Sequence, residues 1–342
     1  MWLKLKILKI VRHILLQLNP ELAHNIAIFC LKYNLVPATF TQNQRCKLDK
    51  PLDYIKQNPI GLAAGFDKNA DCIKNLANLG FDFIEVGTCT PKPQYGNSKP
   101  RLFRLTEQKT IINRFGFNSK GKDYFVKNLK KAMHLTNRPL IGANIGKNKE
   151  TQSIESDYLI MLEAVYNYCD YVAINISSPN TLGLRDIQGE ESLEILLKAL
   201  QEKRLELQNT HGVYRPLFLK IAPDITKEQV IYIVSLSLKY KIDCLIVANT
   251  TIKRDFEDLE VSKFKSEQGG LSGNLLKDLS FSILKDFLDV SQNLIPIISA
   301  GGIDSSEDVK RRLALGAIGV QIYSALIFEG FELIHKIKND TK

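Results

Sequence analysis

The chain has 342 residues, which is long for one domain, although a single α/β barrel of about 250 residues with an extension would account for it. Its 44% hydrophobic and 24% charged residues are ordinary for a folded globular protein. The six cysteines are scattered without a C-x-x-C pair, which argues against a disulfide framework or a zinc cluster and fits a reducing compartment.

The net charge of +9 is distributed unevenly along the chain. Residues 1–20 contain three lysines, one arginine and no acidic residue, so they hold +4 of it. The remainder is spread over a long sequence, which gives little support to a basic nucleic-acid face. We therefore expect no nucleic-acid partner.

Residues 2–18 are predicted to form an amphipathic helix. At 100° per residue, an apolar stripe consists of Leu3, Ile7, Ile10, Val11, Ile14 and Leu18. Lys4 breaks the pattern, but the other side carries Lys6, Lys9, Arg12 and His13. A basic helix with an apolar stripe can lie in the interface of an anionic membrane.

A second helix is predicted over residues 20–34, because Asn19-Pro20-Glu21 provides an N-cap, a first-turn proline and an acidic residue. One of its faces would carry Leu22, Ile26, Phe29 and Tyr33. Neither segment has the roughly 20 uninterrupted apolar residues of a spanning helix, and charges interrupt any signal-peptide core. Periodicity leaves two alternatives open: packing on the protein's own core, and a mitochondrial transit peptide, which the missing serines and the excess of lysine over arginine disfavour.

We thus divide the chain into a membrane-associating helical extension over residues 1–40 and a main domain over 41–342, which begins with a polar connection at 41–58. Eight short apolar segments then recur, and they are predicted as strands: Ile60–Phe66, Phe83–Gly87, Leu140–Ile145, Tyr171–Ile176, Leu217–Ile221, Cys244–Ala248, Ile295–Ser299 and Gly319–Tyr323. Helices are predicted between them at Ala70–Leu79, Lys120–His134, Ser156–Tyr168, Glu190–Gln208, Lys227–Tyr240, Leu275–Asp289 and Ser305–Leu315.

This alternation of apolar strands and helices indicates a parallel sheet covered by helices. Eight strands favour closure into a (β/α)8 TIM barrel, and a doubly wound open sheet is the alternative. Each strand ends in polar or glycine-rich residues, which would converge on one mouth of a barrel, where active sites lie. A Rossmann-like protein should instead carry G-x-G-x-x-G after its first strand, and the sequence has none there.

Two late strand ends suit a phosphate group. Ala300-Gly301-Gly302 and Tyr323-Ser324 follow strands 7 and 8, where barrels commonly bind phosphate. Glycines let backbone N–H groups approach an anion, and a following helix N-terminus adds a favourable dipole. The backbone could approach the ligand closely at a further segment, Gly269-Gly270-Leu271-Ser272-Gly273.

Two lysines and several asparagines stand at the same predicted mouth. Lys68 follows strand 1, and Lys220 lies among apolar residues of strand 5, where burial would need an anionic partner. Lys220 could stabilise a reduced flavin, snorkel from the strand end or form a Schiff base. Amide side chains suit a planar ligand with alternating C=O and N–H groups, and they are Asn113, Asn144, Asn175, Asn180 and Asn249. No Ser-His-Asp set or metal cluster is evident, and we expect no metal.

These residues resemble the class 2, quinone-dependent, dihydroorotate dehydrogenases from about Leu18 to the end of strand 8. The shared strings are LNPELAH at 18–24, GLAAGFDKN at 61–69, EVGTCTPKPQYGNSKPRLFRL at 85–105, INRFGFNS at 112–119, NIGKNK at 144–149, INISSPNT at 174–181 and GGLSG at 269–273. The resemblance implies oxidation of (S)-dihydroorotate to orotate in pyrimidine (UMP) biosynthesis, with FMN accepting the hydride and a membrane quinone reoxidising it.

The resemblance also implies roles for individual residues. FMN would contact Ala64, Gly65, Phe66, Asp67, Lys68, Thr88, Asn144, Asn175, Lys220, Ala248, Gly273, Gly302, Tyr323 and Ser324, with Ala248 standing where the family often has threonine. Substrate would contact Lys68, Asn113, Arg114, Phe115, Gly116, Phe117, Asn175, Asn180, Asn249 and Thr250. His24 and Arg104 match the quinone end.

The base implied by this matching is Ser178, where the otherwise similar class 1 enzymes use cysteine. A serine is too weakly acidic to act unaided near neutrality, and the family supplies help through a water, with Phe117 and Thr181 shaping the exit path. Since quinones are lipid-soluble, the first two helices would form a tunnel into the bilayer, on the cytoplasmic face of a bacterial inner membrane rather than in a mitochondrion. The rivals are a soluble class 1 enzyme, a dihydrouridine synthase and an inactive membrane scaffold.

Overall fold

The computed structural model describes residues 2–36, 50–136, 138–180, 185–256 and 264–341. Its centre is a closed barrel of eight parallel strands, which confirms the predicted (β/α)8 architecture. In order around the barrel these are β1 (Ile60–Leu62), β11 (Gly319–Ile322), β10 (Ile297–Ala300), β8 (Cys244–Val247), β7 (Leu217–Ile221), β6 (Tyr171–Asn175), β5 (Leu140–Ile145) and β2 (Phe83–Cys89). Closure rules out the open doubly wound sheet.

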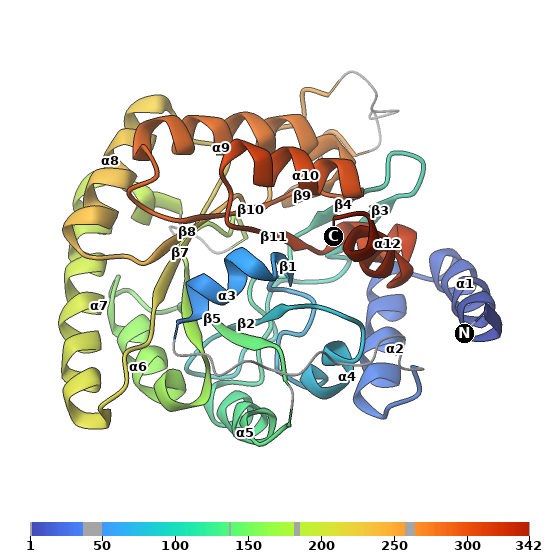
Figure 1. Cartoon of the computed structure of the whole chain (residues 1–342), viewed down its shortest axis with the longest axis horizontal. Helices are drawn as coiled ribbons and strands as arrows, with labels where there is room; N and C mark the ends of the chain where they lie inside the picture. Colours follow the sequence, from blue (N-terminus) through green and yellow to red (C-terminus); the bar gives the residue numbers. More distant parts are fainter. Residues whose placement is uncertain (1, 37–49, 137, 181–184, 257–263, 342) are drawn as a thin grey trace.

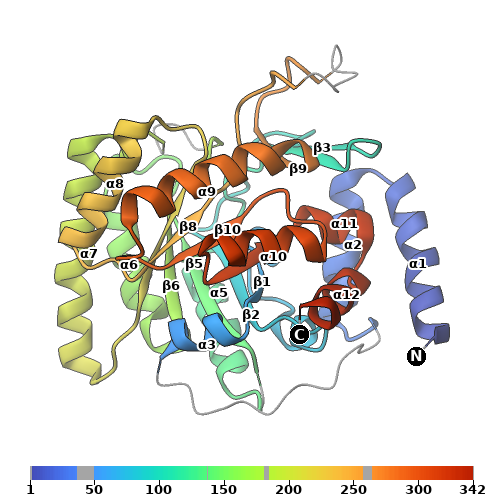
Figure 2. The same ribbon diagram turned by 45° about the horizontal axis from the view of Figure 1, so that its top comes forward.

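Helices surround this barrel, as Figures 1 and 2 show. The outer helices are α4 (Ile73–Ala77), α5 (Lys122–Met133), α6 (Ser156–Val165), α7 (Glu190–His211), α8 (Lys227–Lys239), α9 (Lys277–Ser291), α10 (Ser306–Leu315), α11 (Ser324–Glu329) and α12 (Glu332–Asp340). Short 3-10 turns are η1 (Tyr166–Tyr168), η2 (Arg185–Gln188) and η3 (Asn274–Leu276). All seven predicted helices are present, with ends shifted by a few residues, and α11 and α12 were not predicted.

Two local predictions were wrong. The first strand ends at Leu62 instead of Phe66, because the chain leaves the strand ladder at Ala63 and turns across the barrel mouth. Residues 51–57 are part of a helix rather than a polar connection: α3 (Pro51–Gln57) begins with a proline and buries Ile55. Ile55 packs with barrel residues such as Phe83, so α3 closes the N-terminal end of the barrel.

Large rings fill the lower barrel interior. Tyr171 and Phe218 stack with ring centroids 4.2 Å apart, and both are buried. Space for such rings comes from glycines on neighbouring strands, since a Cβ added at Gly142 would lie 2.1 Å from the Tyr171 ring and one at Gly61 would lie 2.2 Å from the Phe83 ring. The interior is therefore packed and leaves the C-terminal mouth as the place for a ligand.

A second, antiparallel sheet stands above this mouth. It has three strands in the order β3 (Leu102–Leu105), β4 (Thr110–Asn113) and β9 (Gly270–Gly273). β9 lies in the glycine-rich segment 269–273, for which the sequence predicted a close approach of the backbone to a ligand but no strand. No strand was predicted at β3 or β4, and the pairing of β4 with a segment about 160 residues later cannot be read from a local pattern.

The N-terminal extension consists of α1 (Trp2–Gln17) and α2 (Pro20–Lys32), close to the predicted bounds. Figures 1 and 2 both place α1 at one side of the molecule, outside α2. Ile10 and Ile14 are each 56% exposed, as is Phe29 of α2, so these side chains of the predicted apolar faces do not pack on the protein's own core. Among the described residues, no helix is both long enough and apolar enough to cross a membrane.

The floor of the barrel contains a buried ion pair that should dominate local stability. Arg138 Nη2 donates to Asp170 Oδ1 over 2.9 Å, and Asp170 Oδ2 accepts the backbone N–H of Ile141 at the start of β5. Replacing Arg138 with leucine leaves a buried carboxylate without its cation, so the free energy of unfolding should fall by about 3–5 kcal/mol.

Urea denaturation followed by circular dichroism measures this change. The matched control is Lys239→Leu, which breaks the exposed ion pair with Glu194 and should leave the free energy of unfolding almost unchanged. Equal losses in the two variants would contradict the argument from burial.

Candidate functional site

A central cavity lies between the C-terminal ends of the barrel strands and the β3-β4-β9 sheet. It brings together most of the residues predicted to contact FMN or substrate, from strand ends far apart in the sequence. Those on its wall are Ala64, Gly65, Lys68, Thr88, Asn113, Phe115, Gly116, Phe117, Asn175, Ser178, Asn180, Lys220, Ala248, Asn249, Thr250, Gly273, Gly302, Tyr323 and Ser324.

Four predicted residues do not line this cavity. The Asp67 carboxylate is buried and accepts the backbone N–H groups of Asp71 and Cys72, so its side chain fastens the turn before α4. Phe66 lines a different cavity, described below. The guanidinium of Arg114 turns away from the mouth and donates to the carbonyl of Pro100 over 3.1 Å.

The fourth is Asn144, which lies directly beneath the cavity wall. Its Oδ1 accepts the hydroxyl of Thr88 over 2.5 Å, and its amide group donates to Glu85 Oε1 over 2.7 Å. Asn175 Nδ2 donates to the same Thr88 oxygen over 2.8 Å. The amides thus form a continuous polar layer beneath the ligand space, with Thr88 and Asn175 at its surface.

Glu85 of β2 is the centre of this layer, and the sequence analysis missed it. Its carboxylate is fully buried and accepts from Lys220 Nζ at 3.3 Å, Gln321 Nε2 at 2.7 Å and the Tyr171 hydroxyl at 3.4 Å, besides Asn144. This is the anionic partner that burial of Lys220 requires. One signal could have identified it, because Glu85 is the only acidic residue in the eight predicted strands.

The predicted substrate residues face one another across the mouth. Asn180 Nδ2 donates to Asn113 Oδ1 over 3.3 Å, and the backbone N–H of Asn180 donates to the hydroxyl of Ser178 over 3.3 Å. Asn249 Nδ2 donates to Ser177 Oγ over 2.8 Å. Strands β4, β6 and β8 therefore bring amide groups into one small region. Thr181, predicted to shape the exit path, lies outside the described residues.

Lys68 is the cation on this side of the cavity. Its ammonium nitrogen lies 3.8 Å from the centre of the Phe115 ring. Burial, helped by the nearby positive charge of Arg101, lowers the pKa of Lys68 to about 8, while the carboxylates of Glu21 and Asp67 act in the opposite direction. The ammonium is thus desolvated and poised to bind an anionic group.

The far end of the cavity is built around Gly302, and it suits a phosphate. Gly302 has φ of +69°, and an added Cβ would lie 2.4 Å from the Lys277 Cα, so only glycine lets this loop pack so closely against the start of α9. Ser324, which begins α11, lines the same end, and its hydroxyl lies 2.8 Å from that of Ser272.

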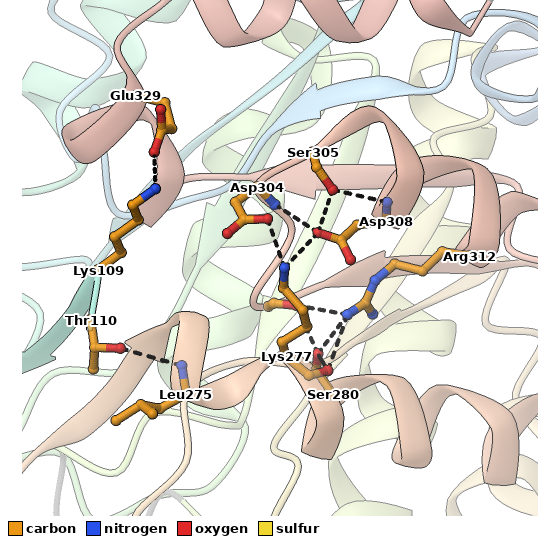
Figure 3. A network of polar contacts seen from close by, with 11 residues as sticks. Lys109, Thr110, Leu275, Lys277, Ser280, Asp304, Ser305, Asp308, Arg312 and Glu329 are labelled. Carbon is orange, nitrogen blue, oxygen red and sulfur yellow. Dashed lines mark hydrogen bonds and ion pairs between the residues drawn. The ribbon is translucent and has the colours of Figure 1, made fainter. Parts of the chain in front are cut away.

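A network behind this loop holds it against α9 (Figure 3). The buried guanidinium of Arg312 donates to Ser280 Oγ over 2.8 Å and to the carbonyl of Gly301 over 3.0 Å. The ammonium of Lys277 lies 2.7 Å from Asp304 and 2.9 Å from Asp308. The loop after β10 is therefore fixed at both ends before any ligand binds.

A second, apolar cavity lies between α1, α2, α11 and the central cavity. His24, Phe66 and Arg104 line it, which brings together both residues predicted for the quinone end. The two cavities share the wall residues Leu102, Ile111, Tyr323 and Ile327. A ligand in one cavity is therefore separated from a ligand in the other by single side chains.

The two polar side chains of the apolar cavity have different environments. Burial is the main cause that lowers the pKa of His24 to about 3, with the charge of Lys68 adding to it, so its imidazole is neutral at physiological pH. Arg104 Nη2 donates to the carbonyls of Leu16 and Leu18 over 2.6 and 2.7 Å, and so connects β3 to the end of α1. In the described part of the chain, no cluster of three or more His, Cys, Asp or Glu side chains could hold a metal ion.

The Glu85–Lys220 pair yields a stability prediction. In Lys220→Met the buried carboxylate loses its cation, and the cofactor-free protein should unfold more easily by about 3–5 kcal/mol. In the double variant Lys220→Met with Glu85→Gln, no charge remains, so most of that loss should be recovered. Chemical denaturation of the cofactor-free forms measures both values, and equal stability of the single and double variants would contradict the pairing.

The comparisons with known proteins agree with this geometry. The family model described as dihydroorotate dehydrogenase matches residues 52–342. A relative named dihydroorotate dehydrogenase (quinone) from Aliivibrio salmonicida is 45% identical, covering 97% of this chain and 99% of the relative. One of the same name from Nitrosomonas europaea is also 45% identical, covering 96% of this chain and 95% of its own length.

Solved structures agree as well. The crystal structure of DHODH from Eimeria tenella in complex with ferulenol has a TM-score of 0.86 and 36% identity, covering 97% of this chain and 93% of that one. The ligand-free form from the same organism has a TM-score of 0.84 and 38% identity, covering 94% of each chain. The predicted resemblance to the quinone-dependent class is confirmed, and the chain belongs to the dihydroorotate dehydrogenase family.

Proposed function

We propose that this protein oxidises (S)-dihydroorotate to orotate for pyrimidine biosynthesis and passes the electrons to a quinone. The main support for this proposal is that two cavities of different polarity adjoin each other and share four wall residues. One cavity presents amides and a lysine, which suit a polar, anionic heterocycle. The other is apolar, which suits a lipid-soluble acceptor. The names of the bacterial relatives support both halves.

FMN is the cofactor proposed for the central cavity, and the residues present fit it. The Gly302 backbone and Ser324 would hold the phosphate, while Lys220, already paired with Glu85, would face the ring where negative charge develops on reduction. Thr88, Asn175 and Ala248 would line the ring. Ala248, which stands where the family often has threonine, offers the ring no hydroxyl group. When bound, FMN supplies a hydride acceptor between the two cavities.

Substrate binding is proposed for the side of the cavity where the asparagines meet. Lys68 would bind the carboxylate of dihydroorotate. The amides of Asn113, Asn175, Asn180 and Asn249 would pair with the C=O and N–H groups of its ring. Gly116 and Phe117 take up left-handed backbone conformations that turn the 112–119 segment across the mouth. The site thereby orients a flat ring and excludes bulk water from it.

Ser178 is proposed as the base that removes the C5 proton of dihydroorotate. It is buried on the cavity wall, and its hydroxyl already accepts a hydrogen bond from the backbone N–H of Asn180. That bond favours the oxygen in its deprotonated form. Since a serine needs further help near neutrality, we propose that a water takes the proton onward.

Replacement of Ser178 tests this role and the overall activity together. In anaerobic stopped-flow, dihydroorotate should bleach the flavin of the wild-type protein, and Ser178→Ala should do so at least about 100-fold more slowly. Quinone should reoxidise dithionite-reduced flavin equally fast in both proteins. A wild-type flavin that dihydroorotate cannot bleach would remove the substrate assignment, and full-speed bleaching in Ser178→Ala would remove only the role of the serine.

Binding of orotate should depend on pH through Lys68. Below the Lys68 pKa of about 8 the ammonium is charged and attracts the orotate carboxylate, and as pH rises through 8 the charge and the attraction are lost. The affinity for orotate, titrated through the change in flavin absorbance, should therefore fall from pH 7 to pH 9. In Lys68→Met the binding should be weaker at pH 7 and nearly independent of pH over this range, and a wild-type affinity that stays constant would exclude the lysine.

The α1–α2 extension (residues 1–40 in the proposed domain division) is proposed to rest on an anionic bilayer surface and to open the apolar cavity toward it. Its exposed apolar side chains are Ile10, Val11, Ile14, Leu22, Phe29, Tyr33 and Leu35. Basic residues of α1 accompany them in sequence. In a bacterium the surface would be the cytoplasmic face of the inner membrane.

Vesicle sedimentation tests the membrane contact. Wild-type protein should sediment with vesicles containing phosphatidylglycerol, and Ile10→Glu with Ile14→Glu should remain largely in the supernatant, because two charges would enter the apolar interface. The control replaces exposed isoleucines on barrel helices, Ile160→Glu with Ile231→Glu, and should bind as wild type does. Equal sedimentation of all three proteins would contradict the proposed surface.

A further inference from the structure

An ion pair joins the N-terminal extension to the substrate side of the barrel mouth. Glu21, in the first turn of α2, accepts from Arg101 Nη2 over 2.8 Å and from Arg101 Nε over 3.2 Å. Both side chains are largely buried, Arg101 being 8% exposed. A guanidinium in such a place is costly without its carboxylate, so docking of α2 and placement of Arg101 depend on each other.

The other side of Arg101 holds the loop between β2 and β3. Its Nη1 donates to the carbonyls of Tyr95 and Asn97 over 2.5 and 3.1 Å. Its own carbonyl accepts the backbone N–H of Arg114 over 2.8 Å. Arg101 therefore fixes both the 95–97 turn and the start of the 114–117 segment.

Asn97 extends this chain of contacts to the predicted substrate residues. Its Nδ2 donates to the carbonyls of Arg114 and Asn180 over 3.0 and 3.2 Å, and its backbone N–H donates to the carbonyl of Phe115 over 2.9 Å. A Cβ added at Gly116 would lie 2.8 Å from this amide, so the packing leaves little room for displacement. Asn180 is in turn bonded to Ser178 through its backbone N–H.

We propose that Glu21 is a positioning residue for the dihydroorotate half-reaction, although it belongs to the helix that lines the apolar cavity. It acts through Arg101 and Asn97 on the Ser178–Asn180 loop and on the 114–117 segment, and it touches no substrate. The inference rests on the proposed function. Its consequence is that the substrate loop reaches its binding geometry only while α2 is docked, so the two cavities are mechanically connected.

The test compares Glu21→Gln with wild type as flavin-loaded full-length proteins. The dissociation constant of orotate, read from flavin absorbance, and the dihydroorotate concentration for half-maximal flavin reduction should both rise about tenfold, the scale of one displaced ligand contact. Because α2 also lines the apolar cavity, the rate of reoxidation of dithionite-reduced flavin by quinone is compared in Asn97→Ala, which keeps the Glu21–Arg101 pair, and there it should stay at the wild-type value. Unchanged orotate affinity in Glu21→Gln would overturn the proposal.

A matched control separates positioning from a general loosening of α2. Asn19 caps the helix by accepting the backbone N–H groups of Glu21 and Leu22, and Asn19→Ala removes both bonds without touching the ion pair. Asn19→Ala should bind orotate as wild type does. The same loss of affinity in Asn19→Ala would assign the effect to helix stability and overturn the proposal.

A second variant tests the path and serves if Glu21→Gln folds poorly. Asn97→Ala removes the side-chain hydrogen bonds to the carbonyls of Arg114 and Asn180, and it should weaken orotate binding to a similar degree. The double variant should be no worse than either single one, because both interrupt the same chain of contacts. Additive losses, or no loss in Asn97→Ala, would overturn the proposal. Failure of dihydroorotate to reduce the wild-type flavin would overturn the proposed function as well.

Discussion

The organisation of the barrel mouth depends on one buried carboxylate. Glu85 lies in the barrel interior with no access to solvent, and its burial is tolerable only because a lysine, two amides and a phenol donate hydrogen bonds to it. These donors come from β5, β6, β7 and β11, so the charge brings side chains from half the barrel to one point. Apolar rings fill the space below it, and the ligand cavity begins above it.

This arrangement explains how a lysine can be held in place inside an apolar barrel. Lys220 is positioned by a fixed partner and not by the ligand, which means that the cavity is organised before anything binds. The same is true at the other end, where Arg312 and Lys277 hold the glycine loop from behind. Pre-organisation of both ends would lower the entropy lost on binding the proposed cofactor.

The sequence predicted the barrel well because each strand is a short apolar run followed by a polar turn, and both signals are local. The resemblance placed nineteen residues on the central cavity wall, and for those at strand ends, such as Lys68, Asn175 and Lys220, the convergence of the C-terminal ends of parallel strands predicts the same place. Glu85 was missed because a single acid inside an apolar strand has no period. The pairing of β4 with β9 and the Glu21–Arg101 pair were missed because they join segments 80 or more residues apart, and no local pattern encodes such contacts.

We propose that the two half-reactions occur in adjoining cavities that share four wall residues. Ala27 lines only the apolar cavity, so Ala27→Trp should fill that space and leave the central cavity intact. Anaerobic double-mixing stopped-flow on the flavin-loaded variant measures both steps. We expect flavin reduction by dihydroorotate at the wild-type rate, with reoxidation by quinone slowed at least about tenfold, the loss expected for an obstructed binding site. Normal reoxidation in Ala27→Trp, or loss of both steps in a folded protein, would contradict it.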